Sequence, residues 1–330
     1  MADTPLAAGK VPVDLLASLL DGFGPTPPEV RVGPGIGEDA AAIDVPAGIL
    51  VVATDPVTLT GSDVGAFAVV VNANDVAVMG ARPRWFLASV LLPQGTTESE
   101  LRELFADLRM ALDDVGAALV GGHTEVTAAV TQPVVVGQMI GLVDDRRVVA
   151  TCGARPGDVL VQSGAVPVEG AAVLAAEAAD RLGEVDPATL DAARNAIRDP
   201  GISVVDGAIL AAQLGATALH DPTEGGLASG LHELARASGV GLRVDADAIA
   251  WFEPGLSVCR ALGADPWATL ASGCLLATFP PDMAREAVDA LRRHGVTAAT
   301  VGEVIEGEAV TKASGEPVAW PERDEVARLT

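Results

Sequence analysis

Three carboxylates in the first half of the chain stand beside apolar or glycine-rich runs, where they could hold a hard cation. Asp39 follows closely spaced glycines that include Gly35 and Gly37, Asp55 follows a Val-rich run, and Asp75 interrupts an apolar segment. Mg²⁺ prefers oxygen ligands and commonly joins one or two carboxylates to the phosphates of a substrate. The glycines would let backbone amides approach the same ligand. This pattern indicates a magnesium site that works with a bound phosphate group.

Each of these segments also has a structural explanation. The glycine-rich segment could be an ordinary turn, and Asp55 could cap a turn before Pro56. Asn72 and Asp75 are three residues apart on an expected helix over 66–79, so they share one face of it. A lone carboxylate is costly to bury without a cation or a donor, which favours a functional role for this pair.

A further polar cluster, Gly-Gly-His-Thr-Glu, follows the expected strand 117–120. Its backbone amides and short polar side chains could meet a phosphate-bound metal, with Gly122 and Thr124 as ligand-binding residues. His123 and Glu125 are candidates for acid–base chemistry. A histidine that makes only a structural hydrogen bond is the alternative.

The second half of the chain holds one comparable motif, His-Asp-Pro-Thr-Glu-Gly-Gly, at residues 220–226. It opens an expected helix. Free amides at the helix N-terminus beside Gly225 and Gly226 would bind an anion, and Asp221 could hold Mg²⁺. His220 is the remaining candidate for a catalytic side chain, and ordinary helix capping is the alternative explanation of the motif.

The charge of the chain excludes some partners. It has 45 Asp and Glu against 21 Lys and Arg, a formal net charge of −24 and a pI near 4.3. Such a surface repels nucleic acids and anionic membranes, so we expect neither as a partner. An acidic surface adopted throughout its source organism is the alternative explanation of the charge.

Cysteine usage and targeting signals favour a cytoplasmic protein. The three cysteines are far apart and form no C-x-x-C pair, which argues against a disulfide scaffold or a zinc site. The first ten residues show no basic stretch followed by an apolar one, so we expect no export signal. The uncharged stretch 126–143 contains Gln, Pro and Gly, and we expect it to form buried strands rather than a membrane helix.

Several common catalytic motifs are absent from the sequence. It lacks the P-loop, the G-x-G-x-x-G loop, the G-x-S-x-G elbow and the H-E-x-x-H motif. Mg²⁺ with a nucleotide is therefore the ligand that the acidic motifs support best.

Hydrophobic periodicity predicts an α+β protein. Val-rich runs alternate with two helical segments between residues 30 and 150. The clearest helix is 97–115, which opens with a capping-box pair of Thr97 and Glu100. Ala-rich helices follow a turn-rich stretch at 153–158. The expected limits are 1–28 for a flexible Gly/Pro-rich arm, 29–150 for a first domain and 151–330 for a second.

Together the motifs resemble the aminoimidazole ribonucleotide (AIR) synthase superfamily in order and spacing. They read G-I-G-E-D-A-A, T-D-P, V-N-A-N-D-V-A-V-M-G-A-R-P, G-G-H-T-E-V-T and H-D-P-T-E-G-G-L. The resemblance runs from about Gly33 to the end of the second domain, and it is strongest to the hydrogenase-maturation branch of HypE type. It implies a two-domain, PurM-like α+β fold, in which the N-terminal α/β domains of a homodimer share a β-barrel at the dimer interface and a C-terminal α/β domain follows.

The resemblance also implies ATP and Mg²⁺ as cofactors, with ATP bound between the two domains. In such enzymes ATP phosphorylates an oxygen of a small-molecule or carrier-bound substrate, and a maturation protein is a candidate partner. The positions that match the metal ligands are Asp39, Asp55, Asp75 and Asp221. The positions that match the nucleotide contacts are Gly35, Gly37, Asn72, Gly122, Thr124, Gly225 and Gly226.

Two departures from the HypE pattern leave the reaction open. His123 stands where HypE-type proteins carry Asp, so the number of metal ions is open and Glu125 is a substitute ligand. The printed sequence ends in 326–330 without the terminal cysteine on which HypE-type proteins act. A small-molecule kinase of the thiamine-monophosphate type and a nucleotide-binding assembly partner with little turnover are therefore the alternatives.

Overall fold

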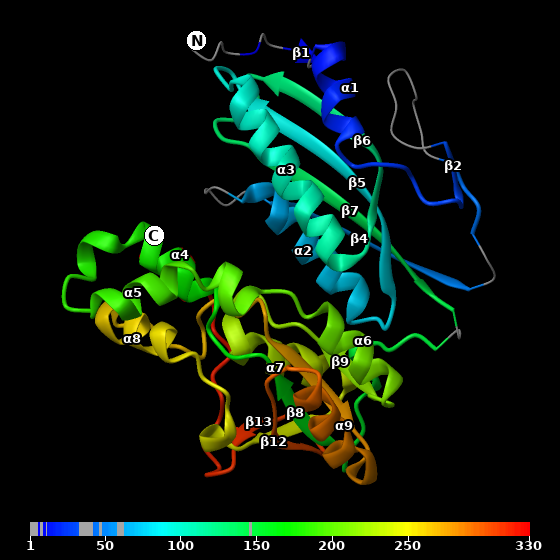
Figure 1. Ribbon diagram of the computed structural model, residues 1–330. Helices are drawn as coiled ribbons and strands as arrows, with labels where there is room; N and C mark the ends of the chain where they lie inside the picture. Colours follow the sequence, from blue (N-terminus) through cyan, green and yellow to red (C-terminus); the bar gives the residue numbers. More distant parts are fainter. Residues whose placement is uncertain are drawn as a thin grey trace. The chain divides into compact units, whose positions relative to one another are not determined.

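The chain folds into two compact units (Figure 1). The structure, a computed structural model, describes residues 6, 9–10, 12–32, 42–45, 48–57, 63–144 and 147–330. Unit 1 contains Met1–Ala77 and Ala81–Val148, and unit 2 contains Val78–Gly80 and Val149–Thr330. Among the described residues, no helix combines the length and the apolar character that a membrane crossing requires.

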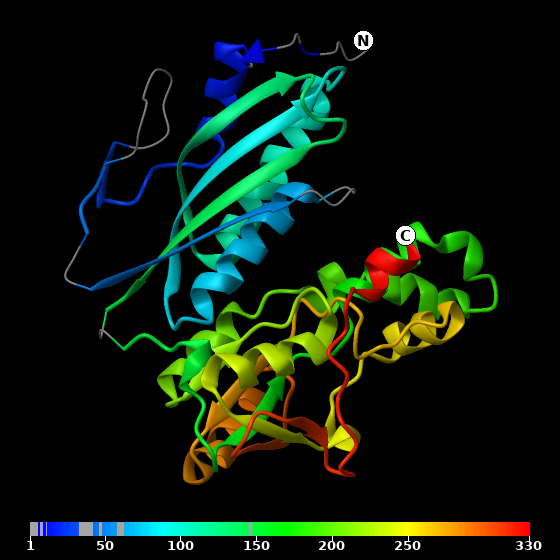
Figure 2. The ribbon, with the colours of Figure 1, turned by 180° about the vertical axis from the view of Figure 1, so that it is seen from behind.

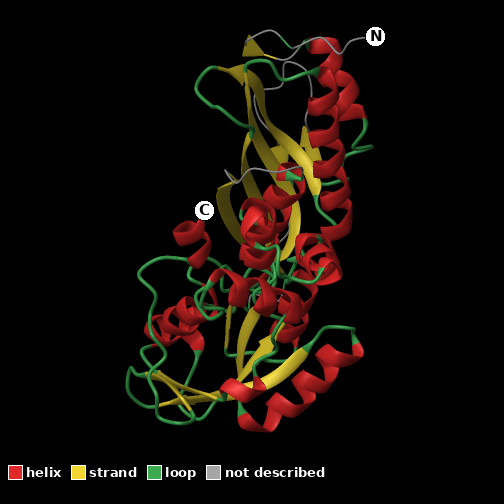
Figure 3. Ribbon diagram, turned by 90° about the vertical axis from the view of Figure 1, so that its left-hand side faces the viewer, coloured by secondary structure: helices red, strands yellow, loops and turns green. Residues whose placement is uncertain are grey.

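Unit 1 is built on one mixed sheet with helices on one side of it (Figure 3). Its elements are β1 (Gly9–Lys10), α1 (Val13–Asp21), β2 (Val30–Val32), β3 (Ala42–Ile43), β4 (Ile49–Val57), α2 (Val64–Ala77), β5 (Arg82–Pro93), α3 (Glu98–Val115), β6 (Ala118–Thr127) and β7 (Val134–Val143). The strand order is β1-β6-β5-β7-β4, and β5 runs parallel to β6 and antiparallel to β7. The short strands β2 and β3 pair separately.

Helix α3 begins and ends as its sequence predicts. Thr97 is the N-cap and forms a capping box with Glu100, whose Oε2 accepts a hydrogen bond from Thr97 N at 2.7 Å. Gly116 ends the helix in the left-handed conformation, where a residue without Cβ avoids strain. The predicted capping box is confirmed, and the leucines at helical spacing are buried.

Glycines in β7 let α2 pack closely against the sheet. A Cβ on Gly137 would lie 2.4 Å from Asn72 Nδ2 and 2.9 Å from Ala68 O. A Cβ on Gly141 would lie 2.9 Å from Ala81 Cβ. Both distances are too short for any side chain. Gly137 therefore keeps the polar side chain of Asn72 in direct contact with β7, and Gly141 leaves room for the turn that follows α2.

The other face of this sheet carries exposed apolar side chains. Side chains along β4 alternate between partly buried and exposed, and Leu50 and Val52 remain 45% and 64% exposed. Their partners in β7 are Leu142 and Ile140. Figure 2 shows this face toward the viewer, with α2 and α3 behind the sheet. An apolar stripe therefore lies on the side of the sheet that α2 and α3 leave open.

Unit 2 is a three-layer α/β/α arrangement around a mixed sheet. The strands are β8 (Val159–Ser163), β9 (Ala218–His220), β10 (Gly241–Val244), β11 (Leu275–Phe279), β12 (Ala298–Ile305) and β13 (Val310–Lys312), in the order β13-β10-β12-β8-β11-β9. The helices are α4 (Glu169–Glu177), α5 (Pro187–Arg194), α6 (Val205–Gln213), α7 (Gly226–Ser238), α8 (Glu253–Leu262), α9 (Pro281–Arg293) and α10 (Glu325–Leu329). Short helical turns are η1 (Thr151–Gly153), η2 (Ala179–Arg181), η3 (Ile197–Gly201) and η4 (Ala246–Ala248).

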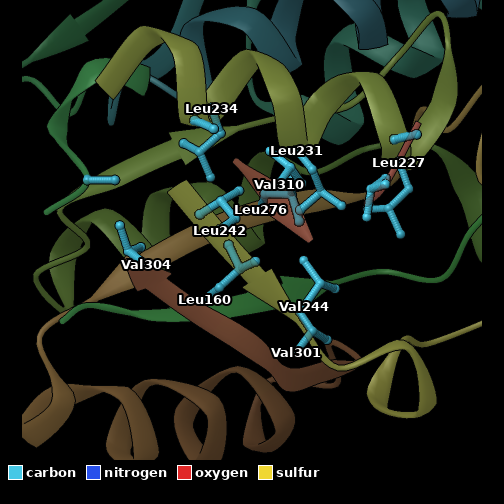
Figure 4. Packing of buried hydrophobic residues seen from close by; sticks show 14 of the residues in the cluster. Leu160, Leu227, Leu231, Leu234, Leu242, Val244, Leu276, Val301, Val304 and Val310 are labelled. Carbon is cyan, nitrogen blue, oxygen red and sulfur yellow. The ribbon is translucent and has the colours of Figure 1, made fainter. Parts of the chain in front are cut away.

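Helix α7 covers one face of the unit 2 sheet. Its leucines Leu227, Leu231 and Leu234 are fully buried against strand residues such as Leu160 and Leu276 (Figure 4). Helices α6 and α9 pack against the sheet from the other side. Gly239, which follows the last residue of this helix, adopts the left-handed conformation that closes it.

Candidate functional site

In unit 1, Asn72 clamps α2 to the edge strand β4. Its Oδ1 accepts a hydrogen bond from Asp55 N at 2.8 Å, and its Nδ2 donates to Asp55 O at 3.3 Å and to Ala68 O at 2.8 Å. Asn72 is fully buried. Both amide hydrogens and one oxygen lone pair are therefore used by the backbone. The side chain fixes the backbone of Asp55, and its predicted contact with a nucleotide stays a prediction.

The strand that carries Asp55 is longer than its sequence predicts. We expected Asp55 to follow the strand formed by the Val-rich run, but β4 continues through Asp55 to Val57. The reason is the antiparallel pairing with β7, which extends over all nine residues of β4 and includes Pro56 without a break. Asp75 lies on α2, about one helical turn beyond Asn72. Asp55 and Asp75 are both partly buried, and the hydrogen bonds of Asn72 join β4 and α2, the elements that carry them.

The cluster around His123 is not a loop after a strand but the middle of β6. A Cβ on Gly122 would lie 2.1 Å from Ala88 O, so this glycine allows β5 and β6 to pair. His123 Nε2 and Glu125 Oε2 are 3.4 Å apart, and both side chains are partly exposed. Thr124, between them, is buried on the other face.

The two polar groups of unit 1 occupy opposite faces of its sheet. Thr124 is buried on the helix-covered side, as strand alternation requires, so its neighbours His123 and Glu125 lie on the open side. Asp55 pairs with Gly137, whose missing Cβ faces Asn72 and Ala68 of α2. A single ligand cannot contact both groups of one sheet without reaching around its edge.

The described residues contain no ready-made metal cage. Among them, no three His, Cys, Asp or Glu side chains gather as a metal site. The predicted residues Gly35, Gly37 and Asp39 lie outside the described part of the chain. A pocket of about 630 Å³ in unit 1 lies at the C-terminal ends of α1 and α3 and is lined by none of the predicted residues.

In unit 2, the motif at residues 220–226 connects β9 to α7. His220 ends β9, and its Nε2 lies 2.8 Å from Glu233 Oε2 on α7. This pairing fixes the orientation of the imidazole ring. Asp221, the next residue, is partly buried.

The amides at the start of α7 are not free, which corrects the expectation from the sequence. Gly225 N donates to Asp324 Oδ2 at 2.7 Å, and Gly226 N donates to Thr223 O at 3.1 Å. Both glycines have positive φ, and a Cβ on Gly226 would lie 2.6 Å from two carbonyl oxygens of a neighbouring loop. The glycines thus serve a tight turn, and a carboxylate of the chain itself lies where we expected a ligand anion. Their contact with a nucleotide stays a prediction.

Two carboxyl groups beside this turn were not found from the sequence. Glu169, the first residue of α4, is 4% exposed and accepts a hydrogen bond from Ser272. Burial raises the pKa of Glu169 from 4.5 to about 7, opposed by this bond and assisted by the nearby carboxylates of Asp324 and Glu224.

Asp324 receives three backbone hydrogen bonds. Burial raises the pKa of Asp324, while the amides of Val326, Gly225 and Leu270 oppose that shift. The sequence carries a signal for one of these bonds, because an Asp before Glu325 and Val326 is typical of a helix N-cap. Nothing local signals the bond to Gly225, which is 99 residues away.

Comparison with known proteins decides the family. Residues 37–143 match the model of the AIR synthase related protein, N-terminal domain, and residues 155–312 match the model of its C-terminal domain. The chain belongs to the AIR synthase related family. A relative, the carbamoyl dehydratase HypE of Azotobacter vinelandii, is 32% identical over 280 residues, which cover 82% of this chain and 79% of the relative.

Two solved structures share the fold of this chain. One is a hydrogenase maturation protein HypE in complex with ATP, which is 26% identical with a TM-score of 0.78. The match covers 95% of this chain and 95% of that protein. The other is a thiamine-monophosphate kinase from Stenotrophomonas maltophilia K279a, which is 22% identical with a TM-score of 0.75. The match covers 92% of this chain and 97% of the kinase. The latter likeness concerns the fold alone.

Proposed function

We propose that this AIR synthase related protein is a HypE-like, ATP- and Mg²⁺-dependent enzyme of hydrogenase maturation. The observation that carries the proposal is the likeness, at 26% identity and over 95% of both chains, to a HypE that binds ATP. The 32% identity to a carbamoyl dehydratase HypE supports the same reaction class. In that reaction ATP would supply the phosphoryl group that activates a carbamoyl oxygen, and Mg²⁺ would neutralise its charge.

The acidic residues of unit 1 suit Mg²⁺ better than a softer metal. Asp55 and Asp75 supply carboxylate oxygens, and the Asn72 clamp fixes the strand that carries the first of them. One or two protein carboxylates with phosphate oxygens form a usual magnesium environment. We assign Asp55 and Asp75 as metal ligands, with Asp39 and Asp221 as further candidates.

Calorimetric titration of ATP, with and without Mg²⁺, tests the proposal. The parent protein binds ATP in a manner that requires Mg²⁺, and Asp75→Asn weakens this binding at least about tenfold, or about 1.4 kcal/mol. Asp114→Asn, an exposed carboxylate on α3, is the matched control and leaves binding unchanged. Absence of ATP binding by the parent protein would contradict the proposed function.

The fate of the phosphate distinguishes the two enzymatic alternatives. A HypE-like dehydration releases free phosphate once the activated oxygen leaves, whereas a kinase of the thiamine-monophosphate type retains phosphate in its product. Following ³¹P signals during turnover with a carbamoyl substrate separates them. ATP binding without turnover on any carbamoyl or thiamine substrate would instead favour the assembly-partner alternative. A maturation protein as partner stays a prediction.

The open face of the unit 1 sheet supports a homodimer. Leu50 and Val52 would lose most of their exposed surface if two such faces met, which favours association at about 25 cal/mol per Å² of apolar surface buried. We infer that this face forms the shared barrel. Val52→Asp then converts a dimer to a monomer in light scattering, while Met110→Asp on the exposed side of α3 does not.

A further inference from the structure

The motif loop of unit 2 is held in place by the C-terminal segment of the same unit. Asp324 Oδ2 accepts from Gly225 N at 2.7 Å, and Oδ1 accepts from Val326 N at 2.7 Å. A third backbone bond comes from Leu270. One carboxylate thus joins three segments: the motif loop, the loop before β11, and α10.

Neighbouring contacts reinforce the same junction. Glu325 N donates to Ala268 O, and Glu325 Oε2 accepts from Asp265 N at 3.2 Å. A Cβ on Gly225 would lie 3.3 Å from the ring of Pro321, so the C-terminal segment lies directly over the turn. Helix α10 rests on α4, with Val326 in their shared core (Figure 2).

The first residue of α4 brings a second carboxyl group to this junction. Glu169 bonds to Ser272 in the loop that Asp324 also binds. The two charged groups that act on Glu169 are both acidic, Asp324 and Glu224. The thiol of Cys259 on α8 is close enough to Asp324 to interact with its charge and adds no positive charge. An ionised Glu169 would therefore meet a buried negative charge with no compensating cation among these groups, which is costly.

We propose that Asp324 is a positioning residue for the loop 221–226, and that the protonated carboxyl of Glu169 beside it makes this positioning depend on pH. With its proton, Glu169 is a neutral neighbour and the loop stays fixed. When the proton leaves to solvent, repulsion between Glu169 and Asp324 loosens the C-terminal segment, and Gly225 N loses its acceptor. The consequence for Asp221 as a metal ligand rests on the proposed function.

Hydrogen–deuterium exchange tests the positioning without any ligand. Amides in peptides covering 221–229 and 318–330 are compared at pH 6.0 and 8.5 in the parent, Glu169→Gln and Asp324→Asn, each rate corrected for intrinsic exchange. We expect the protection factors of these amides in the parent to be at least about tenfold lower at pH 8.5 than at pH 6.0. In Glu169→Gln they should be the same at both pH values. Asp324→Asn should lose protection at both pH values, because Asn has one acceptor oxygen for the two amides, Gly225 N and Val326 N, that the carboxylate oxygens of Asp324 bind.

Two controls keep the outcome decisive. Glu184→Gln, an exposed glutamate of the same unit, should behave as the parent does. Equal protection of the parent and Glu169→Gln at pH 8.5 would overturn the proposal, even if Asp324→Asn failed to fold. A second measurement is the affinity for MgATP at both pH values. Raising the pH from 6.0 to 8.5 should weaken this affinity more in the parent than in Glu169→Gln. A parent that binds no ATP would contradict the proposed function and leave the exchange result to decide the positioning.

Discussion

Replacing Glu169 by Gln should stabilise unit 2 in a pH-dependent way. In the folded protein burial raises the pKa of Glu169 to about 7, whereas the unfolded chain releases the same proton near 4.5. Between these values the folded state binds more protons than the unfolded one, so the free energy of unfolding falls as pH rises, and the loss persists above pH 7. Gln keeps the shape of the side chain and is neutral at every pH.

The size of the effect follows from the two pKa values. The pKa differs between 4.5 in the unfolded chain and about 7 in the folded one, and each pH unit corresponds to about 1.4 kcal/mol. Glu169 therefore lowers the free energy of unfolding of the parent by about 3 kcal/mol at pH 8. At pH 5, where the unfolded chain has only begun to lose the proton, the same calculation gives less than about 1 kcal/mol. Glu169→Gln should therefore raise the free energy of unfolding by these amounts relative to the parent.

Urea unfolding at pH 5 and pH 8 measures both differences. Tryptophan fluorescence reports mainly on unit 2, which holds Trp251, Trp267 and Trp320 of the four tryptophans. Salt is kept constant, since the net charge of −24 makes stability depend on ionic strength. A gain for Glu169→Gln that is equal at the two pH values, or one matched by Glu184→Gln, would refute the reasoning.

Three further predictions concern packing and thiol access. Asn72→Ala leaves Asp55 N without its acceptor and should lower the free energy of unfolding by about 1 to 3 kcal/mol, measured by urea unfolding; an unchanged value would show that the clamp is dispensable. Gly137→Ala pushes a methyl group into Asn72 and should lower the free energy of unfolding by about 1 to 3 kcal/mol in the same assay. Gly183 has open space around it, so Gly183→Ala should leave the free energy of unfolding unchanged. Cys152 is exposed and should react within seconds with a thiol reagent, whereas the other two cysteines, buried and with raised pKa, should react only on unfolding; three fast thiols would contradict their burial.

Local sequence signals sufficed for the ends of two helices but not for the extents of the strands or the contacts between elements. The capping box of Thr97 and the glycine that ends α7 act within one helical turn, so both were predictable. The extent of β4 was not, because the pairing with β7 overrides the turn tendency of Pro56. The family resemblance and the two-domain fold were predicted from motif order, and the comparisons confirm them.

For the candidate site, the sequence indicated residue types but not their arrangement, and the roles of these residues stay predictions. Residue types indicated which carboxylates could hold a metal, but sequence spacing does not tell that His123 and Asp55 face opposite sides of one sheet. Asn72 looked like a ligand residue because a polar side chain in an apolar helix needs a partner, and that partner is the backbone of β4. Glu169 and Asp324 were missed because their contacts lie far away along the chain.

The bond between Gly225 and Asp324 also sets an order of events during synthesis. The ribosome adds residues at roughly 5 to 20 per second, so the 99 residues that separate the two partners take roughly 5 to 20 seconds to make. Helix α7 and its neighbouring strands can associate in that interval, but the turn at the start of α7 has no acceptor for its amide until Asp324 emerges. Nascent chains stalled before this residue should therefore show a collapsed unit 2 whose motif loop a protease still cuts.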